Sequence, residues 1–167
     1  MNEKTRDLVL LPLLALILFL QEEILAFLPN IKLTVFLILL YGKKLGFVRS
    51  SLTVFLYVFL DVVYMNSFSL VFSPFMLLGW MLIPFSMNTL FRHCENTYVL
   101  ALAAAVHSFL YCWIYLIPNA LILHADIFAY LMADVVFEAL LAISSFLCTL
   151  WLYEPLSRVF ARLLPGK

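Results

Sequence analysis

Residues 98–117 read YVLALAAAVHSFLYCWIYLI and contain no Asp, Glu, Lys or Arg. A helix needs about 20 mostly apolar residues to cross about 30 Å of bilayer hydrocarbon, so this stretch predicts a membrane-spanning helix. Further apolar runs lie on both sides of it, between charged or proline-containing breaks. Together they predict six helices, at about 8–28, 29–46, 47–64, 68–87, 98–117 and 127–153.

Prolines are expected to end several of these helices, because proline lacks the N–H that a helix interior needs. Pro29 and Asn30 break the first run, and Pro118 and Asn119 close the fifth. The sixth run is expected to end at Pro155.

The composition supports a membrane location for the whole chain. Hydrophobic residues make up 66% of the 167 residues and charged residues 12%, whereas globular chains are about 45–50% apolar and about 25% charged. The ten Lys and Arg residues are matched by ten Asp and Glu residues, so the chain has no net positive charge to attract the phosphates of nucleic acid. Cys94, Cys112 and Cys148 have neither disulfide-framework nor zinc-site spacing, so they are interpreted as buried thiols. We therefore predict an all-α, polytopic membrane protein with a single domain over residues 1–167, and no soluble enzyme, secreted disulfide scaffold or nucleic-acid binder.

The basic residues predict how the chain is oriented. Nine of the ten fall in segments that the six-helix pattern places on one side: Lys4, Arg6, Lys43, Lys44, Arg49, Arg92, Arg158, Arg162 and Lys167. Only Lys32 falls on the other side. Because cytoplasmic loops carry the excess of Lys and Arg, both termini are predicted to be cytoplasmic.

Acidic residues inside apolar runs are costly, by about 2.5–3.5 kcal/mol on insertion scales, so each one suggests a function. The pattern places Glu22, Glu23, Asp61 and Asp134 in the outer half of the membrane and Glu138 near its middle. Glu22 and Glu23 are adjacent and point about 100° apart, so at most one of them is expected to enter a pocket. The alternative for either is contact with water at the headgroups.

These residues lead to the hypothesis of a ligand pocket between the helices at 68–87, 98–117 and 127–153, covered by the loops at 29–32, 64–68 and 119–126. Asp61, Asp134 and Glu138 would accept hydrogen bonds or pair with a cationic nitrogen, as suits a neutral or cationic heteroaromatic ligand. The candidate binding residues are Asn30, Asp61, Trp80, His107, Tyr111, Tyr130, Asp134 and Glu138. Trp80, Tyr111 and Tyr130 would stack on a ring, whereas His107 is also explained as a hydrogen-bonded packing residue.

Three segments resemble the S component, the substrate-binding membrane subunit of energy-coupling factor (ECF) type vitamin transporters. They are residues 27–33 (FLPNIKL) with the apolar run to Tyr41, Gly42 and Gly46, residues 59–65 (FLDVVYM), and residues 146–156, which contain LYEPL. The resemblance spans nearly the whole chain.

This resemblance implies a bacterial cell-membrane protein that binds a micronutrient at the outer face. It also implies a transmembrane coupling subunit and two ATP-hydrolysing subunits as partners, so no catalytic residue, cofactor or metal is assigned to this chain. The family's Ala-x-x-x-Ala docking pattern is missing here, because the residue four positions after Ala15 is Phe19. Docking to the coupling subunit is therefore assigned to Pro12, Ala15 and Phe19. Two alternatives are an MreD-like scaffold of the cell-shape machinery without a ligand, and an intramembrane enzyme using Glu138 or His107, for which no motif is present.

Overall fold

The computed structural model describes residues 3–66, 68–122, 124 and 126–163, and its regular structure there is all helical. Lys167 of the predicted basic side, and residues 67, 123 and 125 of the predicted covering loops, lie outside the described residues. Six helices follow one another in the described part: α1 (Glu3–Ile24), α2 (Thr34–Leu45), α3 (Phe47–Tyr64), α4 (Phe72–Asn88), α5 (Thr97–Ile122) and α6 (Ile127–Leu163). The predicted all-α class is confirmed.

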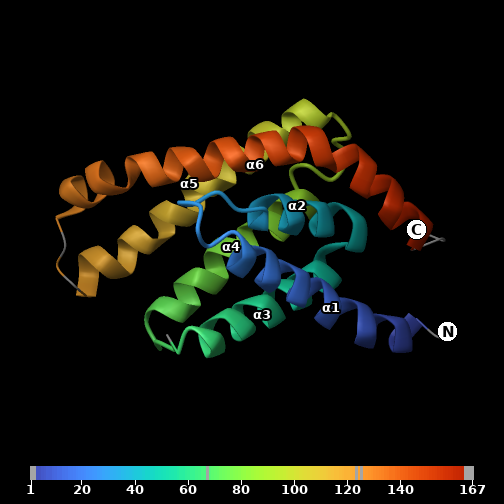
Figure 1. The fold of residues 1–167 in the computed structure, drawn as a ribbon, viewed down its shortest axis with the longest axis horizontal. Coiled ribbons are helices and arrows are strands. Elements are labelled where there is room, and N and C mark those ends of the chain that lie inside the picture. The colour runs from blue at the N-terminus through green and yellow to red at the C-terminus, as the bar shows by residue number, and fades with distance from the viewer. Residues whose placement is uncertain (1–2, 67, 123, 125, 164–167) are drawn as a thin grey trace.

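The helices surround α2. Helices α5 and α6 form a long antiparallel pair on one side of the molecule, and α1 and α3 lie on the other (Figure 1). The short α2 contacts each of the other five helices. Every residue from Thr34 to Gly42 is buried, as expected for a helix that is apolar on all its faces. With 12 residues it is about 18 Å long, which is shorter than the hydrocarbon core of a bilayer.

The outer faces of the bundle are apolar. Large side chains such as Phe128 (74% exposed), Trp151 (68%) and Leu102 (60%) point outward, whereas soluble monomers rarely expose large contiguous apolar patches. Among the described helices, α3, α5 and α6 are long and apolar enough to cross a membrane, and α4 is apolar but shorter. These three helices indicate membrane association.

The helix boundaries differ from the expected ones where polar side chains intervene. Helix α3 has the predicted bounds, whereas α2 begins at Thr34 and not at Pro29. The chain before it turns through Asn30, which has a left-handed φ of 56°, and the Leu33 N–H donates to Gln21 Oε1 (2.8 Å). Helix α4 begins at Phe72, whose N–H donates to Ser69 Oγ (3.2 Å). Hydropathy alone does not report such capping contacts.

Two prolines do not end their helices, contrary to the prediction. Helix α5 continues through Pro118 to Ile122, and α6 continues through Pro155 to Leu163. Near Pro118, the side-chain amide of Asn119 donates to the Tyr115 carbonyl (2.7 Å). Proline lacks the N–H that would bond the carbonyl four residues earlier, which is that of Ile114 here, and membrane helices tolerate the loss of one such bond.

Charged residues lie near both ends of α2. In its last turn, Lys43 Nζ donates to the Phe91 carbonyl (2.9 Å), and beyond it Arg49 Nε donates to Asp7 Oδ2 (2.6 Å). Glu22, Glu23 and Asp61 lie near its N-terminal end. Basic residues near the C-terminal end of α2 thus have acidic partners, whereas acidic residues outnumber basic ones near its N-terminal end.

Candidate functional site

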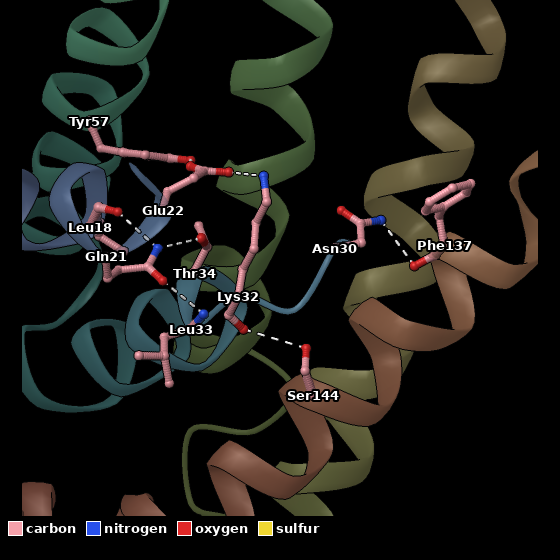
Figure 2. Close-up of polar contacts among 10 residues, drawn as sticks. All are labelled: Leu18, Gln21, Glu22, Asn30, Lys32, Leu33, Thr34, Tyr57, Phe137 and Ser144. Atoms are coloured by element: carbon pink, nitrogen blue, oxygen red, sulfur yellow. Dashed lines mark hydrogen bonds and ion pairs between the residues drawn. The ribbon is translucent and has the colours of Figure 1, made fainter. Parts of the chain in front are cut away.

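The site begins with Gln21, in the last turn of α1. Its side chain donates to Thr34 Oγ1 (2.7 Å) and to the Leu18 carbonyl (2.9 Å), and it accepts the Leu33 N–H (Figure 2). Gln21 thereby satisfies a donor at the start of α2, where Leu33 provides no side-chain cap. The end of α1 and the start of α2 are held together in this way.

Glu22 links the α1–α2 connection to α3. Its carboxylate pairs with Lys32 Nζ and accepts a hydrogen bond from the Tyr57 hydroxyl (Figure 2). The side chain of Glu22 is only 12% exposed and that of Lys32 30%, while Tyr57 is fully buried. The same connection reaches α6, because Asn30 Nδ2 donates to the Phe137 carbonyl (2.9 Å). The α1–α2 connection is thus fixed on both sides.

A cavity of about 430 Å³ lies beside this connection. This volume falls within the range of small-molecule sites, about 300–1,000 Å³. The cavity is lined by Glu22, Glu23, Ala26, Leu28, Pro29, Asn30, Lys32, Asp61, Met65, Met76, Tyr111 and Tyr115. The Glu22 carboxylate contacts Lys32 and Tyr57, whereas the carboxylates of Glu23 and Asp61 make no hydrogen bond or ion pair within the described residues. The cavity therefore has an excess of acidic groups over its one basic group.

Aromatic rings support one wall of the cavity. Tyr111 stacks on Trp80 with ring centroids 3.8 Å apart and an interplanar angle of 22°, and Tyr115 contacts Tyr111 edge to face at 5.4 Å. Tyr57 also contacts Trp80 edge to face, with ring centroids 6.2 Å apart. This close packing requires Gly79, because a Cβ there would lie 2.7 Å from the Tyr111 ring. The Tyr111 ring is therefore held rigidly against α4.

The structure brings only part of the predicted site together. Asn30, Asp61 and Tyr111 line the cavity, and Trp80 lies behind Tyr111 with 2% of its surface exposed. The expectation that at most one of Glu22 and Glu23 enters a pocket is wrong, because the cavity lies at the end of α1 and is wide enough for both to line it. This cavity lies among the α1–α2 connection, α3, α4 and α5, and so differs in position from the predicted pocket.

Lys32 and Tyr115 also line the cavity, although neither is among the predicted binding residues. The sequence places Lys32 in the covering loop at 29–32, and Tyr115 fits an interfacial aromatic belt equally well. The sequence does contain one indication that Lys32 lies near acidic residues. Lys32 follows the acidic pair Glu22 and Glu23 after a short segment that contains Pro29.

Tyr130, Asp134 and Glu138 do not line this cavity. They lie on α6, where Asp134 and Glu138 approach Cys112 of α5. Trp113 Nε1 donates to Glu138 Oε2 (3.3 Å). The three predicted α6 residues therefore belong to a second polar region.

His107 has a packing environment. Its Nδ1 lies 2.7 Å from the Ala103 carbonyl oxygen and its Nε2 lies 2.8 Å from Ser86 Oγ. The ring is buried, and it borders an apolar hollow between α4 and α5. Both ring nitrogens therefore have partners, as a packing residue requires, and His107 does not line the mixed cavity at the start of α2.

The predicted docking residues do not form one exposed stripe. Ala15 is fully buried in the core, so it is unavailable to a partner and that assignment is corrected. Pro12 is exposed, and the half-buried Phe19 packs edge to face on Tyr64 at 5.0 Å. Small side chains on α1 therefore serve internal packing, and Pro12 and Phe19 alone remain candidates for docking.

Two further hollows are mainly apolar. One of about 320 Å³ lies between α3 and α4, and one of about 450 Å³ lies between α4 and α5. Their linings contain no Asp, Glu, Lys or Arg, so they offer few of the placed polar groups that orient a polar ligand. The mixed cavity at the start of α2 is the better candidate for ligand recognition.

Comparison with known proteins found no matching family model, no matching curated protein and no matching solved structure.

Proposed function

We propose that this chain is the micronutrient-binding S component of an ECF-type importer. In this proposal all six helices form a membrane bundle of the bacterial cell membrane, with both termini in the cytoplasm. The cavity at the start of α2 then opens toward the outside and captures the ligand. The chain is not an enzyme, because ATP hydrolysis takes place in the two ATP-binding subunits that join it through a transmembrane coupling subunit.

One observation carries the binding function: a cavity of about 430 Å³ combines the ring of Tyr111 with the carboxylates of Glu23 and Asp61, which have no partner within the described residues. Unpaired carboxylates near a low-dielectric interior are costly and favour a ligand that supplies positive charge or N–H donors. An aromatic wall favours a flat ring or a cation. The chemistry supports a small heteroaromatic compound with a cationic or N–H-donating nitrogen.

The resemblance of residues 27–33, 59–65 and 146–156 to S components supports the transport context. The first segment contains Asn30 and Lys32, and the second contains Asp61, so two of the three segments contribute cavity residues. The basic residues at the opposite end of α2 support a cytoplasmic position for that end.

The binding experiment uses the purified protein in nanodiscs. A panel of pyrimidine, pyridine and other heteroaromatic micronutrients is screened by native mass spectrometry, and affinity is measured by tryptophan fluorescence. We expect one compound to bind with a nanomolar Kd. Asp61→Asn and Glu23→Gln should each weaken binding about ten- to a hundredfold, because each removes a hydrogen bond to a charged group.

Glu95→Gln is the matched control, since Glu95 is exposed and lies near Lys43 at the other end of α2 (3.8 Å). Its Kd should equal that of the unaltered protein. Absence of binding by every compound would overturn the proposal and favour the ligand-free scaffold. Binding that is insensitive to both cavity substitutions would place the ligand elsewhere.

A further inference from the structure

A second cluster of ligand-type atoms lies between α5 and α6, outside the cavity just described. Asp134 and Glu138 are four residues apart on α6 and share one helix face. Cys112 of α5 lies opposite them, and one ligand atom from each of the three residues lies within 4.8 Å of the other two. Sequence spacing did not indicate this cluster, because its members come from two helices.

The state of Glu138 is an independent sign that the cluster has a missing partner. Glu138 is only 3% exposed, and its Oε1 atom is buried with no hydrogen-bond partner. Its other oxygen accepts a long hydrogen bond of 3.3 Å from Trp113. Within the described residues, neither Glu138 nor Asp134 has an ion pair, and the nearby Lys32 pairs with Glu22. A buried carboxylate oxygen without a partner is costly, and a bound cation would relieve that cost.

We propose that Cys112, Asp134 and Glu138 bind one divalent transition-metal ion of the Zn²⁺ or Co²⁺ class. A thiolate with two carboxylates suits these ions, whereas Mg²⁺ and Ca²⁺ take oxygen ligands almost exclusively. The Cys112 thiol loses its proton to water as the sulfur–metal bond forms, since only the thiolate is a ligand. A fourth position remains for water or an outside donor.

The geometry needs only a small adjustment. Metal bonds of about 2.0 Å to oxygen and about 2.3 Å to sulfur place tetrahedral ligand atoms about 3.5 Å apart. The ligand atoms now lie within 4.8 Å of one another, and we expect side-chain rotation to close the remaining difference. This site extends beyond the proposed function, because none of its three residues lines the cavity.

The test uses the purified full-length protein, treated with chelator and titrated with Co²⁺ alone. Direct cobalt–thiolate bonding gives a charge-transfer band in the near ultraviolet, and added Zn²⁺ should remove it by displacement. We expect one ion per chain in the unaltered protein. Cys112→Ser should abolish the band, while Asp134→Asn and Glu138→Gln should keep it and raise the Kd for Co²⁺ by about tenfold or more.

Cys148→Ser is the matched control, because Cys148 is a half-buried free cysteine of α6 outside the cluster. It should leave both the band and the Kd unchanged. Cys112→Ser replaces sulfur by oxygen with little change in shape, and circular dichroism with gel filtration confirms that each variant is folded. A band that persists in folded Cys112→Ser, or no cobalt–thiolate band in the unaltered protein, would overturn the proposal. An organic cation seated on the carboxylates gives no such band and counts against it.

Discussion

Replacing Glu22 by Gln tests the contact that holds the α1–α2 connection in place. The Glu22 carboxylate interacts with Lys32 on one oxygen and with Tyr57 on the other. Each hydrogen bond to a charged group contributes about 1.5–3 kcal/mol when its partner is buried. Lys32 is 30% exposed, so water partly replaces its lost partner, and we expect a total destabilisation of about 2–3 kcal/mol.

The assay is unfolding of the purified protein in mixed micelles with increasing sodium dodecyl sulfate, followed by tryptophan fluorescence. Glu154→Gln is the control, because Glu154 and Arg158 form an ion pair at 3.4 Å whose side chains are 65% and 76% exposed. This exposed pair should contribute only about 0–0.5 kcal/mol. The double variant Glu22→Gln with Lys32→Met should be less destabilised than the sum of its single variants, by about 1–2 kcal/mol. The stabilising role of the Glu22–Lys32 contact is refuted if Glu22→Gln and Glu154→Gln lower the free energy of unfolding equally. It is also refuted if the double variant is destabilised by the full sum of its single variants, because Glu22 and Lys32 would then not stabilise the α1–α2 connection together.

Two further substitutions test the packing that supports the cavity. Gly79→Ala should weaken ligand binding about tenfold or more and destabilise the fold by about 1–3 kcal/mol, because the added Cβ would lie 2.7 Å from the Tyr111 ring. An unchanged Kd in the fluorescence assay would show that the position of this ring is unimportant for binding. Ser108→Ala should lower the free energy of unfolding by about 0.5–1.5 kcal/mol and leave ligand affinity unchanged, because Ser108 donates to Ser145 (3.0 Å) between α5 and α6. A change in affinity for this second variant would contradict a purely structural role.

The sequence by itself determined the class of the molecule. A composition of 66% hydrophobic residues and long uncharged runs require an all-helical chain with apolar outer faces, because backbone groups in lipid must be satisfied within each helix. The bounds of α3 followed directly, since both of its ends coincide with breaks in the apolar run. Helices α5 and α6 continue through Pro118 and Pro155, contrary to the sequence prediction, because a proline removes only one backbone hydrogen bond and need not end a long apolar helix.

Only the tertiary structure decided which polar residues meet. Asp61 and Asp134 are both acids inside apolar runs, yet one lines the cavity and the other lies beside Cys112. The burial of Ala15 and the pairing of Glu22 with Lys32 depend on which face each helix presents to α2. Hydropathy sets which segments leave water, but the rotation of each helix about its axis is set by side-chain packing between helices, which no single segment contains.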